Sequence, residues 1–590
     1  MSNKDGTQIM EQKWHEGLCW FRSTIFYLFF VSGVINLLAL TGAFYMLQIY
    51  DRALTSRSLD TLLVISVLAV GLYLFQGLLD VTRSQILVRL GARADQGLAP
   101  LAHSVAVDMP RYGFSPSEAS DRIRDVDTLR QFISGQGPIA LLDLPWMPLY
   151  LAFIYMLHPM LAALVVAGAT VLLTLTLITE LVTRRNAPAI SRAAVARAAL
   201  AESHVRNVEV LHAMGMTSSA TARFEKANSE HLRLQMNSSD LTGTFGGLSK
   251  IIRMILQSAV LGLGAYFTIV GELTAGAIIA ASVASARALA PMDMVISQWR
   301  GFVAARRSYR RLKDTISSSL SANPLVDLPQ PTASLKVERI TLAAPGTGAV
   351  VLSDISFQLE AGQAVGLIGP SGSGKSSLAR AITGIWPLVR GNVRLDEADI
   401  TQWNRDALGR HIGYLPQDVA LMDGTVAENI CRFAPSADGM EIIAAAQAAG
   451  VHEMILRLPL GYETPLGATG TALSAGQRQR IALARAIYLR PFLVVLDEPN
   501  SNLDAEGELA LACVIEKLRS LGSIAVVIAH RPSVLKAVDQ VGVMQGGKLI
   551  AFGPKDSILE KHTRQPRPAA VVAHAKGRTL NPAPMQVAGE

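Results

Sequence analysis

The chain has 590 residues, of which 50% are hydrophobic, and its mean hydropathy of +0.31 favours a membrane protein. Its net charge of +7 lies mostly on arginines beside apolar segments, with no basic face interleaved with aromatic residues, so we expect no nucleic-acid partner. The three cysteines are too few and scattered for a disulfide framework, and no paired metal-ligand spacing occurs.

The first half of the chain contains six apolar segments, most of which approach the roughly 20 apolar residues that a bilayer crossing requires. They are Ser23–Leu47, Leu59–Leu79, Ile139–Leu157, Leu161–Ile178, Ile255–Val270 and Ala275–Ile296. The alternative is long helices buried in a soluble protein, but six in one stretch disfavour it. The first segment is too long for the apolar core of a signal peptide, so we expect it to remain as a span.

Arginine and lysine flank these spans unevenly. They are concentrated in the connection between spans 2 and 3, in the connection between spans 4 and 5, and after span 6. Because positive residues stay on the cytoplasmic side, we expect both termini and both long connections there, with the connections continuing the spans as helices. Residues 1–22 are expected to be a cytoplasmic or interfacial segment.

One charged residue stands near the middle of a predicted span. Arg287 lies within span 6, where an ionisable side chain is costly and is often functional. Arg287 is therefore the strongest candidate for lining a polar pathway through the membrane. The alternative is that Arg287 pairs with another side chain inside the helix bundle.

A phosphate-binding loop follows the apolar stretch Ala364–Ile368, which predicts a buried strand, and precedes Leu378–Ile382, which predicts a helix. The nine residues expected to contact phosphate are Gly369, Pro370, Ser371, Gly372, Ser373, Gly374, Lys375, Ser376 and Ser377. The loop N–H groups and the helix N-terminus favour an anion, Lys375 should reach the β- and γ-phosphates, and the Ser376 hydroxyl should ligate Mg²⁺. A glycine-rich turn without a ligand is the alternative, and the strand–loop–helix context disfavours it.

Two carboxylates follow a second apolar stretch, Phe492–Leu496. Asp497 and Glu498 therefore fall at the carboxyl end of a buried strand, where ligands bind in an open parallel sheet. We expect Asp497 to hold Mg²⁺ through water and Glu498 to activate the attacking water. A solvent-exposed acidic turn would be the alternative if no phosphate loop lay upstream.

Over about residues 335–555 these motifs resemble the ATPase domain of ABC transporters. Gln417 is similar to the glutamine of the Q-loop, Asp504 to the aspartate of the D-loop, and His530 to the switch histidine that contacts the γ-phosphate. The signature motif of the family is matched by Leu473, Ser474, Ala475, Gly476 and Gln477. The resemblance implies ATP and Mg²⁺ as cofactors.

The resemblance also implies a fold and an assembly. The fold is a six-helix α-helical membrane domain of the ABC exporter type, at 23–313, followed by an α/β P-loop nucleotide-binding domain at 335–560. Residues 314–334 have the composition of a linker, and 561–590 that of a disordered tail. In this family the signature of one subunit closes over the nucleotide of the other, which implies a homodimer.

Two positions depart from the family pattern. Ala475 replaces a usual glycine, and its methyl group is expected to slow the ATPase without abolishing it. The segment Leu342–Gly346 lacks the aromatic residue that often stacks on adenine. The sequence does not identify the group that would replace that ring.

Several segments resemble, more closely, the type I protein-secretion branch that exports proteases, lipases and repeat-in-toxin proteins. They are Tyr50–Arg52, Asp143–Trp146, Gly271–Thr274, Arg287–Pro291, Gln298–Phe302 and Gly384–Pro387. The resemblance implies ATP-driven export of an unfolded polypeptide with a C-terminal signal from the bacterial inner membrane. Its implied partners are a periplasmic membrane-fusion adaptor, an outer-membrane tunnel protein and the secreted protein itself. A lipid or small-amphiphile exporter is the alternative, and an ATP-gated channel or regulator is a remote third reading.

Overall fold

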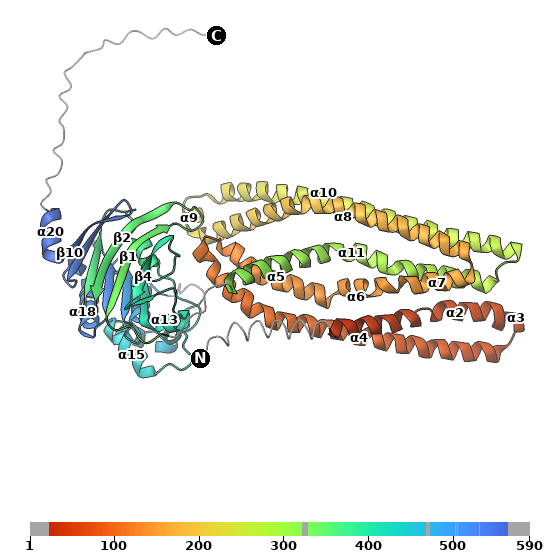
Figure 1. The fold of residues 1–590 in the computed structure, drawn as a ribbon, viewed down its shortest axis with the longest axis horizontal. Coiled ribbons are helices and arrows are strands. Elements are labelled where there is room, and N and C mark those ends of the chain that lie inside the picture. The colour runs from red at the N-terminus through yellow and green to blue at the C-terminus, as the bar shows by residue number, and fades with distance from the viewer. Residues whose placement is uncertain are drawn as a thin grey trace, which may run out of the picture. The chain divides into compact units, whose positions relative to one another are not determined.

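The computed structural model describes residues 23–320, 328–467, 473–501, 503, 505–529 and 532–563. Two predicted site residues, Asp504 and His530, lie outside the described residues, as do residues 1–22 and 564–590. The chain divides into two compact units, residues 1–323 and 324–590, and each is described by itself. Figure 1 shows the first unit as long helices and the second as mixed helices and strands.

The described part of the first unit is helical almost throughout, as its apolar spacing predicts. Its elements are a helix at 23–38, α2 (Thr41–Gln48), η1 (Ile49–Ala53), α3 (Leu54–Ser56), α4 (Leu59–Asp108), η2 (Met109–Tyr112), α5 (Pro116–Ser134), α6 (Gln136–Asp143), η3 (Leu144–Trp146), α7 (Met147–Leu157), α8 (Pro159–Arg206), α9 (Val208–Ala213), α10 (Thr217–Val270) and α11 (Ala275–Leu320). Six helical segments are long and apolar enough to cross a membrane, and each contains one of the predicted spans. The helical continuation of spans 2, 4 and 5 is confirmed by the lengths of α4, α8 and α10.

The third span is not one helix. α6 ends at Asp143, a short 3-10 turn follows, and α7 begins at Met147. Pro145 and Pro148 lie in the first turns of the two later elements, where a residue without an N–H costs no intrahelical hydrogen bond. The break therefore follows from the two prolines.

Apolar side chains of α4 point away from the protein interior. Leu63, Val67 and Leu74 are each more than 60% exposed, and the most apolar window of this segment is only 6% buried. A water-soluble protein rarely exposes so large a contiguous apolar surface. This surface suits a lipid environment, which agrees with the predicted second span.

A buried polar cluster joins the first three spans. The Arg83 guanidinium donates to Asp143 Oδ1 at 2.7 Å and to Ser32 Oγ at 2.9 Å, and Asn36 Nδ2 donates to the same Asp143 oxygen at 2.9 Å. Arg83 and Asp143 are both buried. Because a lone charge is costly inside an apolar bundle, the pairing explains how both residues are accommodated.

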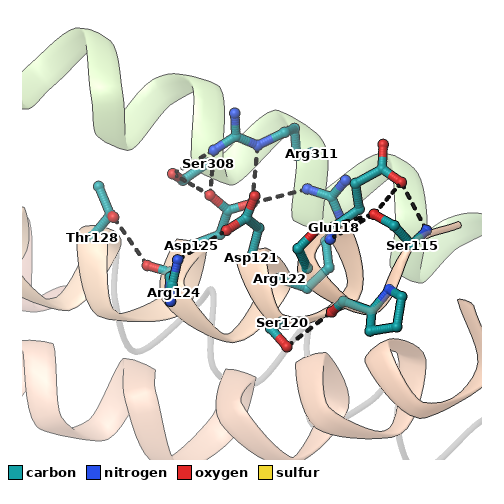
Figure 2. Close-up of polar contacts among 12 residues, drawn as sticks. Ser115, Glu118, Ser120, Asp121, Arg122, Arg124, Asp125, Thr128, Ser308 and Arg311 are labelled. Atoms are coloured by element: carbon teal, nitrogen blue, oxygen red, sulfur yellow. Dashed lines mark hydrogen bonds and ion pairs between the residues drawn. The ribbon is translucent and has the colours of Figure 1, made fainter. Parts of the chain in front are cut away.

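A second polar cluster joins α5 to α11 beyond the spans (Figure 2). The Asp125 carboxylate of α5 accepts hydrogen bonds from Ser308 Oγ at 2.8 Å and from Arg311 Nε at 2.9 Å, both on α11. Arg122 NH1 adds a bond at 3.1 Å to the same carboxylate. At the start of α5, Ser115 and Glu118 form a capping box, which fixes where the helix begins. These bonds hold α5 and α11 together where α11 leaves the predicted membrane region.

The second unit contains two sheets in its described part. Its strands are β1 (Ser334–Ala343), β2 (Val350–Glu360), β3 (Ala364–Ile368), β4 (Arg390–Leu395), β5 (Ala398–Asp399), β6 (Ile412–Leu415), β7 (Leu493–Asp497), β8 (Ile524–Ile528), β9 (Gln540–Gln545) and β10 (Lys548–Pro554). One sheet has the order β2-β1-β4-β5 and is antiparallel. The other has the order β10-β9-β3-β8-β7-β6 and is parallel except for β10.

Helices complete this unit and bury the parallel sheet. They are α12 (Lys375–Ile382), α13 (Arg405–His411), α14 (Val426–Ile430), α15 (Gly439–Ala448), α16 (His452–Leu456), η4 (Gly461–Glu463), α17 (Ala475–Ile487), α18 (Ala505–Ser520), α19 (Pro532–Leu535) and α20 (Lys555–Thr563). The central strands β7 and β8 are buried at every residue, as expected for strands covered on both faces. Two predicted boundaries differ: the stretch predicted as linker is helical from 314 to 320, and α20 continues three residues past 560.

Candidate functional site: a nucleotide site at the edge of the parallel sheet

The predicted phosphate loop lies between β3 and α12 and has a conformation that requires glycine at two positions. Gly369 has φ +152°, and a Cβ there would lie 2.2 Å from the Met544 carbonyl oxygen. Gly374 has φ +96°, and a Cβ there would lie 2.7 Å from the Leu352 side chain. Any larger residue would therefore displace the loop. The loop leads directly into the N-terminus of α12, where free N–H groups and the helix dipole favour an anion.

The Lys375 side chain folds over this loop. Its ammonium donates hydrogen bonds of 2.9 Å each to the carbonyl oxygens of Gly369 and Pro370. Burial lowers the pKa of Lys375, while the nearby carboxylates of Glu498 and Asp497 act in the opposite direction. The ammonium thus lies at the mouth of the loop, where phosphate oxygens could replace the two carbonyls as acceptors.

Ser376 and Asp497 come together from different elements. Ser376 Oγ donates to Asp497 Oδ1 at 3.1 Å, joining the start of α12 to the end of β7. Asp497 is 1% exposed, and among the described residues its Oδ2 has no hydrogen-bond partner. Burial raises the pKa of Asp497, against the hydrogen bond from Ser376. A buried, unsatisfied carboxylate oxygen beside a hydroxyl fits a hard cation such as Mg²⁺ or its bound water.

Glu498 and Gln417 lie at the same edge of the sheet. Glu498 follows β7 directly, is half-buried, and has φ +51°, a left-handed conformation rare for a non-glycine residue. Its N–H donates to the Ile528 carbonyl oxygen at 3.1 Å, which ties it to the end of β8. Gln417 follows β6 and is exposed, and β6 pairs in parallel with β7 up to Leu415 and Leu496. Parallel strands thus place both residues at the carboxyl edge where ligands bind.

The signature residues begin α17. Ser474 is its N-cap: Ser474 Oγ accepts from Gln477 N at 3.3 Å, and Gln477 Oε1 accepts from Ser474 N at 2.9 Å. Leu473 is buried, whereas Ser474 and Ala475 are exposed, and Gly476 follows in the first turn. Among the described residues, no hydrogen bond links this segment to the phosphate loop of the same chain. The exposed helix N-terminus is therefore free to face another molecule.

A functional residue that sequence reasoning missed connects the signature helix to the carboxylates. Gln479 of α17 is buried, and its amide nitrogen donates to the carbonyl oxygens of Glu498 at 3.2 Å and Pro499 at 2.6 Å. The sequence shows a glutamine two residues after the signature motif. The carbonyl groups that it contacts lie about twenty residues further along the chain, so no local pattern reveals the contact. The amide thus holds the left-handed turn that positions the Glu498 carboxylate.

The Gln479→Ala variant should have an ATP turnover reduced about thirtyfold, because two hydrogen bonds of about 1 kcal/mol each would be lost from the catalytic loop. The KM for ATP should change less than about twofold, since the hydrogen bonds lost are those to the Glu498 and Pro499 carbonyl oxygens and not to the phosphate loop. Steady-state ATP hydrolysis by the full-length protein measures both quantities.

Two further variants separate positioning from packing. Gln479→Glu keeps the shape of the side chain but loses the N–H donors, so it should resemble Gln479→Ala. Gln447→Ala, at an exposed position of α15, serves as the matched control and should leave turnover unchanged. Normal turnover in Gln479→Glu would contradict a role for the hydrogen bonds.

The predicted pathway residue, Arg287, belongs to the first unit. Arg287 is exposed on α11, and among the described residues it makes no hydrogen bond or ion pair. Among the described residues, an electrostatic interaction with the buried Tyr150 of α7 is what supports the alternative, a partner inside the helix bundle. A role for Arg287 in the pathway stays a prediction.

Both units of the chain are similar to known protein families. The chain matches the family models of the ABC transporter, at residues 352–501, and of the ABC transporter transmembrane region, at residues 25–292. It is 49% identical over 528 residues to the type I secretion system ATP-binding protein PrsD of Rhizobium meliloti, covering 90% of this chain and 91% of the relative.

Two relatives with lower sequence identity are also named for secretion or export. The cyclolysin secretion/processing ATP-binding protein CyaB of Bordetella pertussis and the leukotoxin export ATP-binding protein LtxB of Aggregatibacter actinomycetemcomitans are each 28% identical over 536 residues, covering 90% of this chain and 75% of each relative. A bacterial Atm1-family ABC exporter solved with ATP bound has a TM-score of 0.78 at 22% identity, covering 92% of this chain and 96% of that one. The predicted fold class is confirmed.

Proposed function

Because this chain belongs to the ABC transporter family, we propose that it is the ATP-hydrolysing permease of a bacterial type I protein secretion system. It exports unfolded polypeptides, using ATP bound at the edge of the parallel sheet. The observation that carries this proposal is the 49% identity to a type I secretion ATP-binding protein over nine-tenths of both chains. The names of the toxin-exporting relatives favour a protein over a lipid or small amphiphile as cargo.

The residues around the phosphate loop take distinct roles in ATP hydrolysis. The loop N–H groups and α12 bind the phosphates, and Lys375 exchanges its two carbonyl acceptors for β- and γ-phosphate oxygens. Ser376, Asp497 and Gln417 would hold Mg²⁺, which neutralises phosphate charge when bound. The unpartnered Asp497 Oδ2 supports this assignment.

Glu498 is the general base in this proposal. Glu498 follows the metal-binding aspartate, and its main chain is held by hydrogen bonds to Ile528 of β8 and to Gln479. From there it orients the attacking water and accepts its proton, while the Lys375 ammonium stabilises the charge on the γ-phosphate. His530 is proposed to contact the γ-phosphate, and Asp504 to belong to the D-loop.

The active form is proposed to be a homodimer with two composite ATP sites. The N-terminus of α17, with Ser474 exposed, would close over the nucleotide held by the phosphate loop of the second subunit. The exposed Ala475 methyl group would lie at this contact and slow closure. Six spans in each subunit would give twelve in the dimer.

The chain is a multi-pass protein of the bacterial inner membrane. We propose that its ATPase domain and both termini are cytoplasmic, since connections rich in arginine favour the cytoplasmic side. A periplasmic membrane-fusion adaptor and an outer-membrane tunnel protein would carry the polypeptide onward. Arg287, exposed on α11, is proposed to line the pathway.

Deleting the gene tests the proposed function. The culture medium of the deletion strain should lack at least one protein that the parent strain secretes, while the cellular level of that protein persists. Quantitative mass spectrometry of the extracellular proteins makes the comparison. An unchanged set of extracellular proteins, together with ATPase stimulation by lipids alone, would favour a lipid exporter.

A further inference from the structure

A pocket of about 510 Å³ opens between α8, α10 and α11 of the first unit. Its wall includes Glu180 and Arg184 of α8, His231 of α10, and Trp299 and Arg307 of α11. Glu180 lies two residues beyond the predicted end of span 4, and Trp299 three residues beyond that of span 6. The pocket therefore begins where these helices leave the predicted membrane core, and it extends away from the core to Arg307, 11 residues past span 6, and His231, 24 residues before span 5.

Several donors on the wall of the pocket have no acceptor. Among the residues that the structure describes, Arg184 and Arg307 make no hydrogen bond or ion pair, although Arg307 is half-buried. His231 is 7% exposed, and its Nδ1 has no partner. Because buried polar groups are ordinarily paired, His231 and the half-buried Arg307 indicate a missing ligand, and the exposed Arg184 guanidinium lies on the same wall.

Two further donors on the wall, Trp299 and Arg300, are already engaged. Trp299 Nε1 donates to the Glu180 carboxylate, and Arg300 donates to the Ser238 carbonyl oxygen at 3.0 Å. Glu180 is the one acidic residue on the wall, against three arginines, so the wall carries a net positive charge. A ligand that satisfies the free donors must therefore be an anion with several acceptor oxygens.

We propose that this pocket binds the phosphate headgroup of an anionic phospholipid from the membrane leaflet on the ATPase side. Guanidinium groups match phosphate oxygens in pairs, and basic pockets between membrane helices on the cytoplasmic side suit lipid headgroups. Trp299 is an indole of the kind enriched at the membrane interface.

Apolar residues beside the pocket favour a lipid over a free phosphate. Ala187, Ile190 and Val303 form part of its wall, and Leu177 and Leu181 of α8 are exposed toward the predicted span. Acyl chains would cover these side chains, whereas inorganic phosphate would leave them exposed. A lipid held between α8 and α11 would bridge two helices of the export machinery.

The test measures lipid binding to the full-length protein in detergent by native mass spectrometry, with phosphatidylglycerol, phosphatidylcholine and inorganic phosphate as probes. Phosphatidylglycerol should bind at least about tenfold more tightly than phosphatidylcholine, and the Arg184→Ala/Arg307→Ala variant should lose at least about tenfold of that affinity. The Arg185→Ala/Arg306→Ala variant removes two neighbouring exposed charges outside the pocket and should stay within about twofold.

ATP hydrolysis by each variant reports folding, since none of these arginines lies in the nucleotide site. If the double variant does not fold, Arg184→Ala alone should weaken phosphatidylglycerol binding by about threefold. Equal losses in both double variants, or no preference for the anionic lipid, would overturn the proposal. The proposal would also be overturned if the pocket bound inorganic phosphate, or an acidic peptide from an exported protein, through these arginines and did not bind lipid. This experiment measures lipid binding and not export. A negative result would therefore not contradict the proposed function.

Discussion

The Glu498→Gln variant is expected to bind ATP with nearly unaltered affinity but to hydrolyse it about 10²–10⁴-fold more slowly, the range that a general base contributes. The amide keeps the size of the side chain and its place after β7, where the main chain is fixed by bonds to Ile528 and Gln479. It cannot accept the proton of the attacking water. Single-turnover hydrolysis and equilibrium binding of ATP separate the two effects.

The matched control is Glu516→Gln, which makes the same chemical change at an exposed position of α18. It should hydrolyse ATP at the rate of the unaltered protein. ATP turnover by Glu498→Gln within about twofold of the control would show that another group activates the water. Loss of ATP binding would instead point to a structural role for the carboxylate.

The Lys375→Ala variant is expected to bind ATP about 10–100-fold more weakly. Its ammonium lies at the phosphate loop, and a hydrogen bond to a charged group is worth about 1.5–3 kcal/mol. The two loop carbonyls that it now contacts would lose a donor, but both can be reached by water once the side chain is gone. Isothermal titration of the full-length protein with ATP measures the change.

Lys517→Ala removes the same charge from an exposed site on α18 and should leave ATP affinity unchanged. A thermal melt without nucleotide shows whether Lys375→Ala is folded. A folded variant with undiminished ATP affinity would refute the proposed role of Lys375 and, with it, the assignment of the loop.

Local sequence predicted the phosphate loop well because its parts are contiguous. A buried strand, a glycine-rich turn and a helix start within nineteen residues, from Ala364 to Ile382, and the structure has β3 and α12 at these places. Asp497 and Glu498 could be placed for the same reason, since a run of apolar residues ending in acids defines a strand end. The left-handed conformation of Glu498 was not predicted, because no local residue type demands it.

The sequence alone did not predict contacts between residues that lie far apart in the chain. In the sequence Arg83 is one of the many arginines after span 2, but in the structure it is buried against Asp143, sixty residues away. Gln479 had no signal that it would support the Glu498 turn. The pocket between α8, α10 and α11 depends on three helices whose packing no periodicity specifies. Such pairings arise from tertiary packing, which a single sequence does not reveal.

The measurement that tests the central claim most directly is complementation of secretion in the deletion strain. A protein that disappears from the medium on deletion should return when the unaltered gene is supplied. It should not return with the Glu498→Gln allele, although that variant reaches the membrane in equal amount. Recovery of the protein with the Glu498→Gln allele would contradict ATP-driven export through this chain.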